Sequence, residues 1–142
     1  IFNELLLQTT LPLISIVEVT KEYVKNKELK KLILLGTQFT MSSSFYSDVF
    51  TKSDIELFTP DTDEQTYIQD KIFSELQFGI VKKDTKAELI TIIDKLKNET
   101  QSEGVILACT ELPLILKPED VGLHYINPTQ IHIDAIVNAC QS

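Results

Sequence analysis

Two kinds of hydrophobic pattern alternate along this chain: short continuous apolar runs, and stretches in which apolar residues recur every three or four positions. Continuous runs are typical of strands buried on both faces of a sheet, and the three-to-four spacing is typical of amphipathic helices. The runs predict strands at residues 11–17, 31–37 and 105–108, and shorter strands are expected at residues 55–59 and 124–127. Helices are expected at residues 1–8, 20–27, around 45–50, from 61–64 to 79, at 85–99 and from 128 onward. This alternation predicts an α/β fold with a mainly parallel sheet that helices flank on both faces.

Residues at the element boundaries support this reading. Ser42–Ser44 are N-cap candidates, and the acidic residues of 61–64 suit a helix start. Gly79 suits the position after a helix end, and Pro128 suits the first position of the last helix.

The strand at 105–108 is followed directly by Cys109, Thr110 and Glu111. Open parallel sheets bind ligands beyond the carboxyl ends of their strands, so a site is expected here. Cys109 has two interpretations. It is either a buried structural thiol, as free cysteines often are, or a functional thiol whose pKa is lowered by a helix that starts after it. The residues alone leave both interpretations open.

A second set of polar residues, Thr37 and Thr40, follows the strand at 31–37. If the two strands are neighbours, these hydroxyls converge with Thr110 on one crevice. The alternative is that they cap the next helix, and one residue can do both. On the last helix, Cys140 is expected to face the core. His132 is expected to be structural, with a ligand-facing role near the helix start as the alternative.

Composition narrows the function classes. A net charge of −8 argues against nucleic-acid and anionic-membrane partners, which require clustered basic residues. No apolar segment approaches the roughly 20 residues that cross a bilayer, and the start of the chain has no secretion signal. We therefore expect reduced thiols in a cytoplasmic protein. The cysteines and histidines lack metal-ligand spacing, and no phosphate-binding glycine motif is present, so no metal or nucleotide is expected.

Four segments, in this order and spacing, resemble the aspartate/glutamate racemase superfamily: LLGTxxTM, IxxELxxGI, GVILACTELPLIL and INPTxIHxxAI. Glutamate racemases carry His where this chain has Glu111, so the resemblance is to the aspartate-racemase-like branch. It implies two similar α/β domains with the active site in the cleft between them, and neither pyridoxal phosphate nor a metal. Two residues, usually both cysteine, face opposite sides of the substrate α-carbon.

The resemblance also assigns roles to individual residues. Cys109 matches the second catalytic cysteine, and Thr110 would hold the α-carboxylate and amino group of the substrate. Thr37 and Thr40 match positions that line the cleft, and Glu111 matches the acidic position after the Cys–Thr pair. The resemblance makes a homodimer plausible. The function it implies is cofactor-independent, two-base racemization of an aspartate-like or broader set of amino acids.

Three departures from the family pattern matter. The family's first catalytic residue stands in a Cys–Asn–Thr or Thr–Asn–Thr segment just before the helix with which this chain begins, and no such segment is present. Asn127 replaces a frequent Asp, and Ile80 stands where a lysine often follows the glycine. We therefore expect residues 1–28 to be the tail of a first α/β domain, 29–127 the second α/β domain and 128–142 a helix returning to the first.

The expected partners are a small amino-acid or dicarboxylic-acid substrate and the missing N-terminal half. The chain by itself is expected to lack racemase activity, because the partner acid/base is absent. Two alternatives remain open: a decarboxylase or isomerase of a small dicarboxylic acid from the same superfamily, and a non-catalytic ligand-binding relative.

Overall fold

A parallel sheet of four strands, in the order β2-β1-β3-β4, lies at the centre of the part of the chain that the computed structural model describes, residues 1–141. The strands are β1 (Lys31–Leu35), β2 (Glu56–Phe58), β3 (Gly104–Leu107) and β4 (His124–Ile126). The central pair aligns Leu35 with Leu107, and β4 aligns Ile126 with Ile106. The predicted α/β architecture is confirmed.

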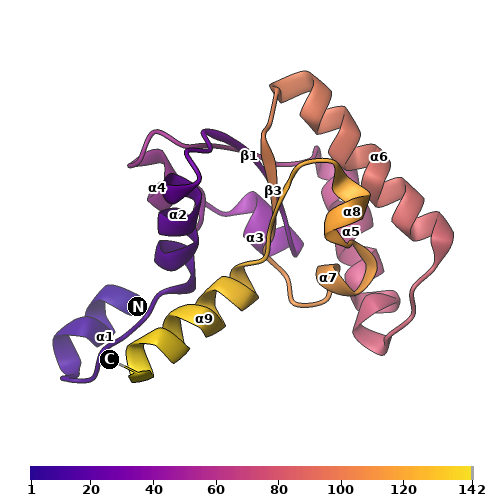
Figure 1. The fold of residues 1–142 in the computed structure, drawn as a ribbon. Coiled ribbons are helices and arrows are strands. Elements are labelled where there is room, and N and C mark those ends of the chain that lie inside the picture. The colour runs from indigo at the N-terminus through magenta and orange to yellow at the C-terminus, as the bar shows by residue number, and fades with distance from the viewer. Residues whose placement is uncertain (142) are drawn as a thin grey trace.

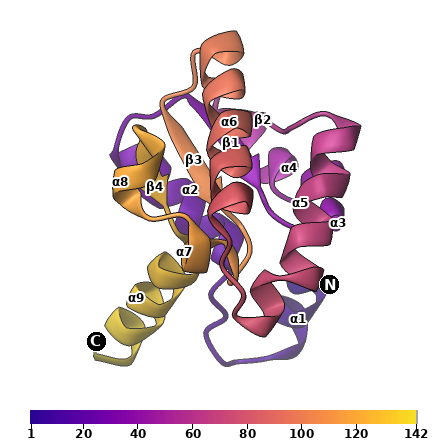
Figure 2. The same ribbon diagram turned by 90° about the vertical axis from the view of Figure 1, so that its right-hand side faces the viewer.

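Helices cover both faces of the sheet (Figure 1). α2 and α4 lie on one face, and α5 and α6 lie on the other, as the turned view also shows (Figure 2). The helical elements are α1 (Phe2–Gln8), α2 (Ile16–Asn26), α3 (Gln38–Ser42), α4 (Ser47–Thr51), α5 (Thr62–Ser74), the 3-10 helix η1 (Leu76–Phe78), α6 (Lys83–Thr100), α7 (Leu112–Ile115), α8 (Pro118–Val121) and α9 (Pro128–Gln141).

The alternation of side chains along the strands divides the core into two clusters. Ile33, Leu35, Val105 and Leu107 pack against the side with α5, α6 and α7. Leu32, Leu34, Ile106 and Ile126 pack on the opposite side with α2 and α4. The central strands β1 and β3 are buried on both faces and are continuous apolar runs rather than alternating ones, as the sequence pattern indicated. The outer strands β2 and β4 are only partly buried.

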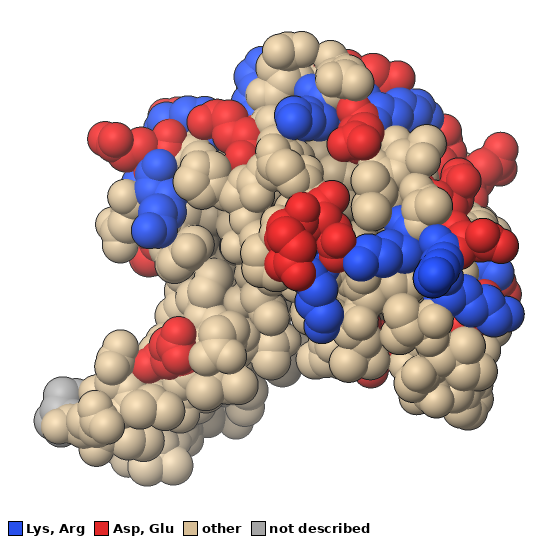
Figure 3. Space-filling view, turned by 45° about the vertical axis from the view of Figure 1, so that its right-hand side comes forward, with Lys and Arg blue, Asp and Glu red and all other residues tan. Residues whose placement is uncertain are grey.

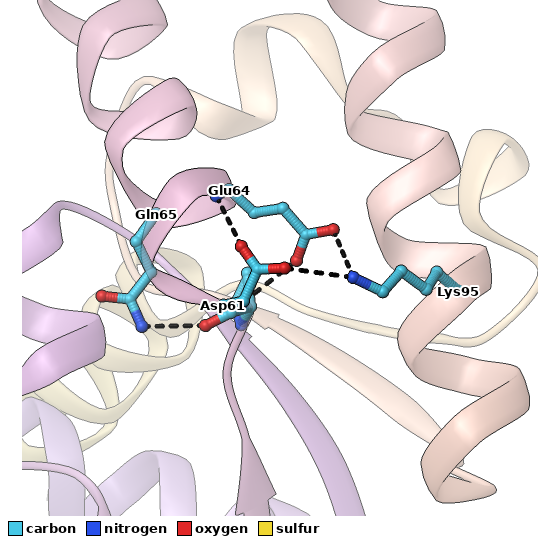
Figure 4. A network of polar contacts seen from close by, with 5 residues as sticks. Asp61, Glu64, Gln65 and Lys95 are labelled. Carbon is cyan, nitrogen blue, oxygen red and sulfur yellow. Dashed lines mark hydrogen bonds and ion pairs between the residues drawn. The ribbon is translucent and has the colours of Figure 1, made fainter.

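The start of α5 shows how local signals place a helix. Asp61 accepts a hydrogen bond from the Glu64 backbone amide at 2.9 Å, and the Glu64 side chain accepts one from the Asp61 amide at 3.1 Å. Lys95 of α6 bridges both carboxylates, and Gln65 donates to the carbonyl of Pro60 (Figure 4). This capping box joins α5 to α6 and fixes where the helix begins.

The strand predicted at residues 11–17 is wrong. Leu11 is 72% exposed, and the segment is an unpaired connection that leads into α2, which begins at Ile16. Ser15 accepts a hydrogen bond from the Glu18 amide, so Ser15 is a helix N-cap. Val17 and Val24 then enter the core on one side of α2. The apolar residues at the end of the run therefore belong to a helix face.

Two further expectations about helices need correction. The cap before residue 45 is not supplied by Ser42–Ser44: α3 ends there, and α4 begins after Tyr46 without a side-chain cap. Cys140 is exposed rather than buried. Its helix, α9, packs along α2 and extends past the sheet (Figure 1), so Cys140 near its end has no core to enter. Ser142 lies outside the described residues.

The surface is unevenly charged. Figure 3 shows basic and acidic side chains gathered over the upper part of the molecule, whereas the arm that ends at the C-terminus is almost free of charge. Asp134 is the one charged residue of α9, and Ile133, Ile136 and Val137 are exposed on the same helix. α1 likewise has no buried residue. None of the helices in residues 1–141 combines the length and apolarity needed to cross a bilayer.

Replacing Ile93 with alanine will test the packing of α6 on the sheet. Ile93 is fully buried, so Ile93→Ala is expected to lower the free energy of unfolding by about 2–5 kcal/mol. The matched control is Ile133→Ala, because Ile133 is half exposed on α9 and its truncation is expected to change stability by less than about 1 kcal/mol. Urea unfolding measures both values, and equal losses would contradict the assigned core.

Candidate functional site

The candidate site is built where β3 leaves the sheet. All four residues of β3 are buried, and the Ala108 amide still donates to the Leu35 carbonyl at 2.7 Å. Cys109 follows half-buried and Thr110 exposed, before α7 begins at Leu112. Figures 1 and 2 place α3, α7 and the start of α9 around this end of the strands. The polar residues therefore stand at the carboxyl edge, where the sequence placed them.

Cys109 and Glu111 are hydrogen-bonded to one another. The Sγ atom of Cys109 donates to Oε2 of Glu111 at 3.0 Å, and Oγ1 of Thr110 donates to the same oxygen at 2.8 Å. Two donors that converge on one carboxylate oxygen favour its ionised form. The three residues thus form a compact thiol–carboxylate–hydroxyl cluster.

The protonation states in this cluster are unequal. Burial, followed by the hydrogen bond to Glu111, raises the pKa of Cys109 to about 11, against smaller opposing contributions from the Glu111 and Leu112 backbone amides. The hydrogen bond from Cys109, followed by that from Thr110, lowers the pKa of Glu111. Near neutral pH the cluster is therefore a neutral thiol beside a carboxylate.

The sequence allowed a helix N-terminus to lower the thiol pKa, and that expectation is wrong. α7 has only four residues, and two backbone amides do not outweigh burial and a neighbouring negative charge.

The second strand end lies beside the first because β1 and β3 are paired. Thr37 caps α3: its Oγ1 accepts from the Thr40 amide at 3.5 Å and lies 3.2 Å from the Thr40 hydroxyl. Gly36 permits this approach, since a Cβ atom there would lie 3.3 Å from both the Ala108 carbonyl oxygen and Thr40 Cβ. The condition set from the sequence, that the two strands are neighbours, is confirmed. The threonines cap the helix and also stand at the shared edge.

Sequence reasoning missed Gln69. This residue lies half-buried on α5, and its Oε1 accepts a hydrogen bond of 2.8 Å from the Gln38 amide, at the first residue of α3. Gln69 thereby fixes the turn that carries Thr37 and Thr40. An isolated glutamine beside the buried face of a helix gives no periodic or motif signal that would have revealed this contact.

Glu75 was also missed. Its carboxylate is almost fully buried and accepts from the Thr85 hydroxyl at 2.7 Å and from Lys71 at 3.0 Å. Lys82 lies 3.5 Å from the same carboxylate. The hydrogen bond from Thr85 is the largest cause that lowers the pKa of Glu75. Lys82 is thus paired with Glu75. It lies two residues after Ile80, the position at which the family often has a lysine.

Other residues considered from the sequence have structural contacts. His132 Nε2 lies 2.9 Å from the Ile14 carbonyl oxygen and joins α9 to the segment before α2. Oδ1 of Asn127 accepts from the amides of Thr129 and Gln130, so Asn127 caps α9. The side-chain oxygen of Asn127 thus caps the start of α9, at a position where the family often has Asp.

Comparison with known proteins identifies the family. The sequence model described as Asp/Glu/Hydantoin racemase matches residues 1–136. The chain belongs to the Asp/Glu/hydantoin racemase family. A relative encoded in the pnlA 3′ region of Pectobacterium carotovorum subsp. carotovorum is 31% identical over 134 residues, covering 91% of this chain and 85% of that protein.

Solved racemase-like structures share the fold. PH1733, an aspartate racemase homologue from Pyrococcus horikoshii OT3, superposes with a TM-score of 0.93 at 30% identity, over 99% of this chain and 62% of its own. A putative Asp/Glu racemase from Yersinia pestis gives a TM-score of 0.86 at 30% identity, over 93% and 57% of the two chains. The aspartate racemase of Picrophilus torridus gives 0.71 at 25%, over 89% and 52%. The chain thus spans 52–62% of the length of these solved proteins.

Removing the Gln69 acceptor is expected to loosen the turn at Thr37. Gln69→Leu deletes one hydrogen bond of roughly 1 kcal/mol, so the Gln38 amide should exchange with solvent about fivefold faster. Gln69→Glu keeps an oxygen acceptor and should preserve the protection. Amide hydrogen exchange resolved by NMR measures both, and unchanged exchange in Gln69→Leu would show that another group holds the turn.

Proposed function

We propose that this chain carries one acid/base residue, Cys109, of a cofactor-independent amino-acid racemase with aspartate-like or broader specificity. The single observation that carries the proposal is the position of the Cys109 thiol. It stands at the carboxyl edge of the sheet, hydrogen-bonded to a carboxylate and beside the exposed Thr110. Membership in the racemase family supports the reaction class.

Racemization requires a group that gives or takes a proton at the α-carbon. An α-proton of an amino acid is very weakly acidic, so the carbanion that forms needs positioned donors. In its thiol form Cys109 delivers a proton: the S–H bond breaks, a C–H bond forms and a thiolate remains. In the reverse direction the thiolate takes the α-proton. Cys109 serves one face of the α-carbon in both directions.

The hydroxyl groups at the two strand ends are proposed to hold the substrate. Thr110 is exposed beside the thiol, and because its hydroxyl proton goes to Glu111, its oxygen is proposed to accept from the substrate ammonium group. Thr37 and Thr40 come from the adjacent strand end and are proposed to face the α-carboxylate. Glu111 uses Oε2 for the thiol and for Thr110, and in this proposal its other oxygen accepts from the substrate ammonium group. No pyridoxal phosphate or metal takes part.

The second base belongs, in this proposal, to the part of the racemase fold that lies outside the match to this chain. Two apolar surfaces support a first domain that packs here. α1 exposes Leu5, Leu6 and Leu7, and α9 exposes Ile133, Ile136 and Val137. Helices that expose an apolar face to solvent are typical of interfaces. Figure 3 shows the surface hollowed between the arm that contains α9 and the rest of the molecule, and the substrate is proposed to lie there.

Exchange of the α-proton in deuterated water tests the role of Cys109. We expect the chain to incorporate deuterium into one enantiomer of aspartate or glutamate, because a single thiol meets one face of the α-carbon. The thiolate must remove the α-proton, so incorporation should be slow near neutral pH and should rise with pH toward the Cys109 pKa of about 11. Cys109→Ala is expected to reduce the incorporation to the uncatalysed background. Cys140→Ala is the control, since Cys140 is exposed on α9, and it should leave incorporation unchanged. Mass spectrometry with chiral chromatography reads the result, and exchange that survives Cys109→Ala would remove Cys109 from the mechanism.

One observation favours a second reaction class. Cys109 rests as a thiol, which is a proton donor, and decarboxylation of a malonate-like acid requires one donor on one face of the carbon that loses carbon dioxide. An α-substituted malonate in deuterated water would then release bicarbonate and gain one deuterium, both dependent on Cys109. A malonate that stays intact while an amino acid exchanges would restrict the chain to racemase chemistry.

A further inference from the structure

Glu111 occupies a helix N-cap position without capping the helix. It immediately precedes α7, yet its side chain accepts no hydrogen bond from the first turn of that helix. Asp61 and Thr37, at the equivalent positions of α5 and α3, do accept from their helices. A carboxylate at an N-cap normally satisfies one of the unpaired amides. Here the carboxylate is turned to the thiol of Cys109 instead.

We propose that Glu111 is a positioning residue that holds Cys109 as a thiol, so that Cys109 starts each turnover as the proton donor. The 3.0 Å hydrogen bond from Sγ to Oε2 aims the thiol proton at a negative charge, and the Thr110 hydroxyl holds that charge in place. Glu111 holds the thiol in the protein without substrate, and its effect on turnover rests on the proposed racemase function.

The consequence for turnover follows from charge. When Cys109 gives its proton to a carbanion, a thiolate forms beside the Glu111 carboxylate, and two negative charges at hydrogen-bonding distance repel one another. The thiolate therefore regains a proton readily, from the α-carbon of the substrate or from solvent. Glu111 thus favours the direction of reaction in which the base on the opposite face removes the α-proton and Cys109 then donates its own proton.

Glu111 is the charged partner of the thiol. Burial is the largest cause of the raised Cys109 pKa, the hydrogen bond to Glu111 and its negative charge raise it further, and two backbone amides lower it. Thr37 and Thr40, at the adjacent strand end, carry no charge. His132 of α9 is engaged with the Ile14 carbonyl. A change at Glu111 therefore reports on the thiol directly.

The test is the pH dependence of thiol alkylation by iodoacetamide, in a Cys140→Ser background so that only Cys109 reacts. The parent should react slowly at pH 8, and its rate should rise toward pH 11. Glu111→Gln keeps the side-chain shape and removes the charge, so the midpoint should fall by about one pH unit and the rate at pH 8 should rise about tenfold. Glu119→Gln makes the same change of net charge on exposed α8 and should leave the profile within twofold.

An unshifted midpoint in folded Glu111→Gln, or an equal shift in Glu119→Gln, would overturn the proposal. A second measurement needs no variant at Glu111: the S–H stretching band in infrared spectra at pH 8, assigned by its loss in Cys109→Ala. A band shifted to lower frequency supports a thiol that donates to a carboxylate, and absence of the band would refute it. Because neither readout requires turnover, a failure of α-proton exchange would remove the racemase proposal and leave this one standing.

Discussion

The pairing of β1 with β3 is the interaction on which the candidate site depends. Alignment of Leu35 with Leu107 brings two strand ends to one edge, and the hydrogen bond from the Ala108 amide to the Leu35 carbonyl extends that pairing to the residue before Cys109. Gly36 allows the two ends to approach without a side chain between them. The site residues predicted from the sequence follow one of these two strands: Thr37 and Thr40 come after β1, and Cys109, Thr110 and Glu111 come after β3. The sheet therefore determines where the site residues lie, and the segments that carry them after each strand are short.

Electrostatics then determine what this geometry can do. A cysteine at a strand end is reactive when its surroundings favour thiolate, and here burial and a carboxylate favour the thiol. The same hydrogen bond lowers the pKa of Glu111, so the proton stays on sulfur and the negative charge on oxygen. In the racemase reaction proposed above, this thiol would be the proton donor on one face of the α-carbon.

The sequence was a good guide where one signal dominated. Continuous apolar runs located β1 and β3, shorter segments located β2 and β4, and the acidic start and Gly79 bounded α5 and η1. It failed at residues 11–17, where a helix cap at Ser15 and the helix periodicity of Val17 and Val24 outweighed a strand-like run. It failed at Cys140, because an apolar helix face does not reveal whether a core lies opposite. The direction of the thiol pKa and the contact of Gln69 depend on side-chain geometry, which residue order alone does not determine.

The separation of β1 from β3 along the chain has a consequence for how the protein is made. Leu35 and Leu107 are roughly seventy residues apart, so their pairing closes a long loop, and such pairings are slow to form during folding. Until β3 joins the sheet, Cys109 is neither buried nor held against Glu111, and its thiol titrates near the ordinary value for cysteine. The newly synthesised chain is thus more open to oxidation at Cys109 than the finished fold. Folding itself is the step that protects the thiol.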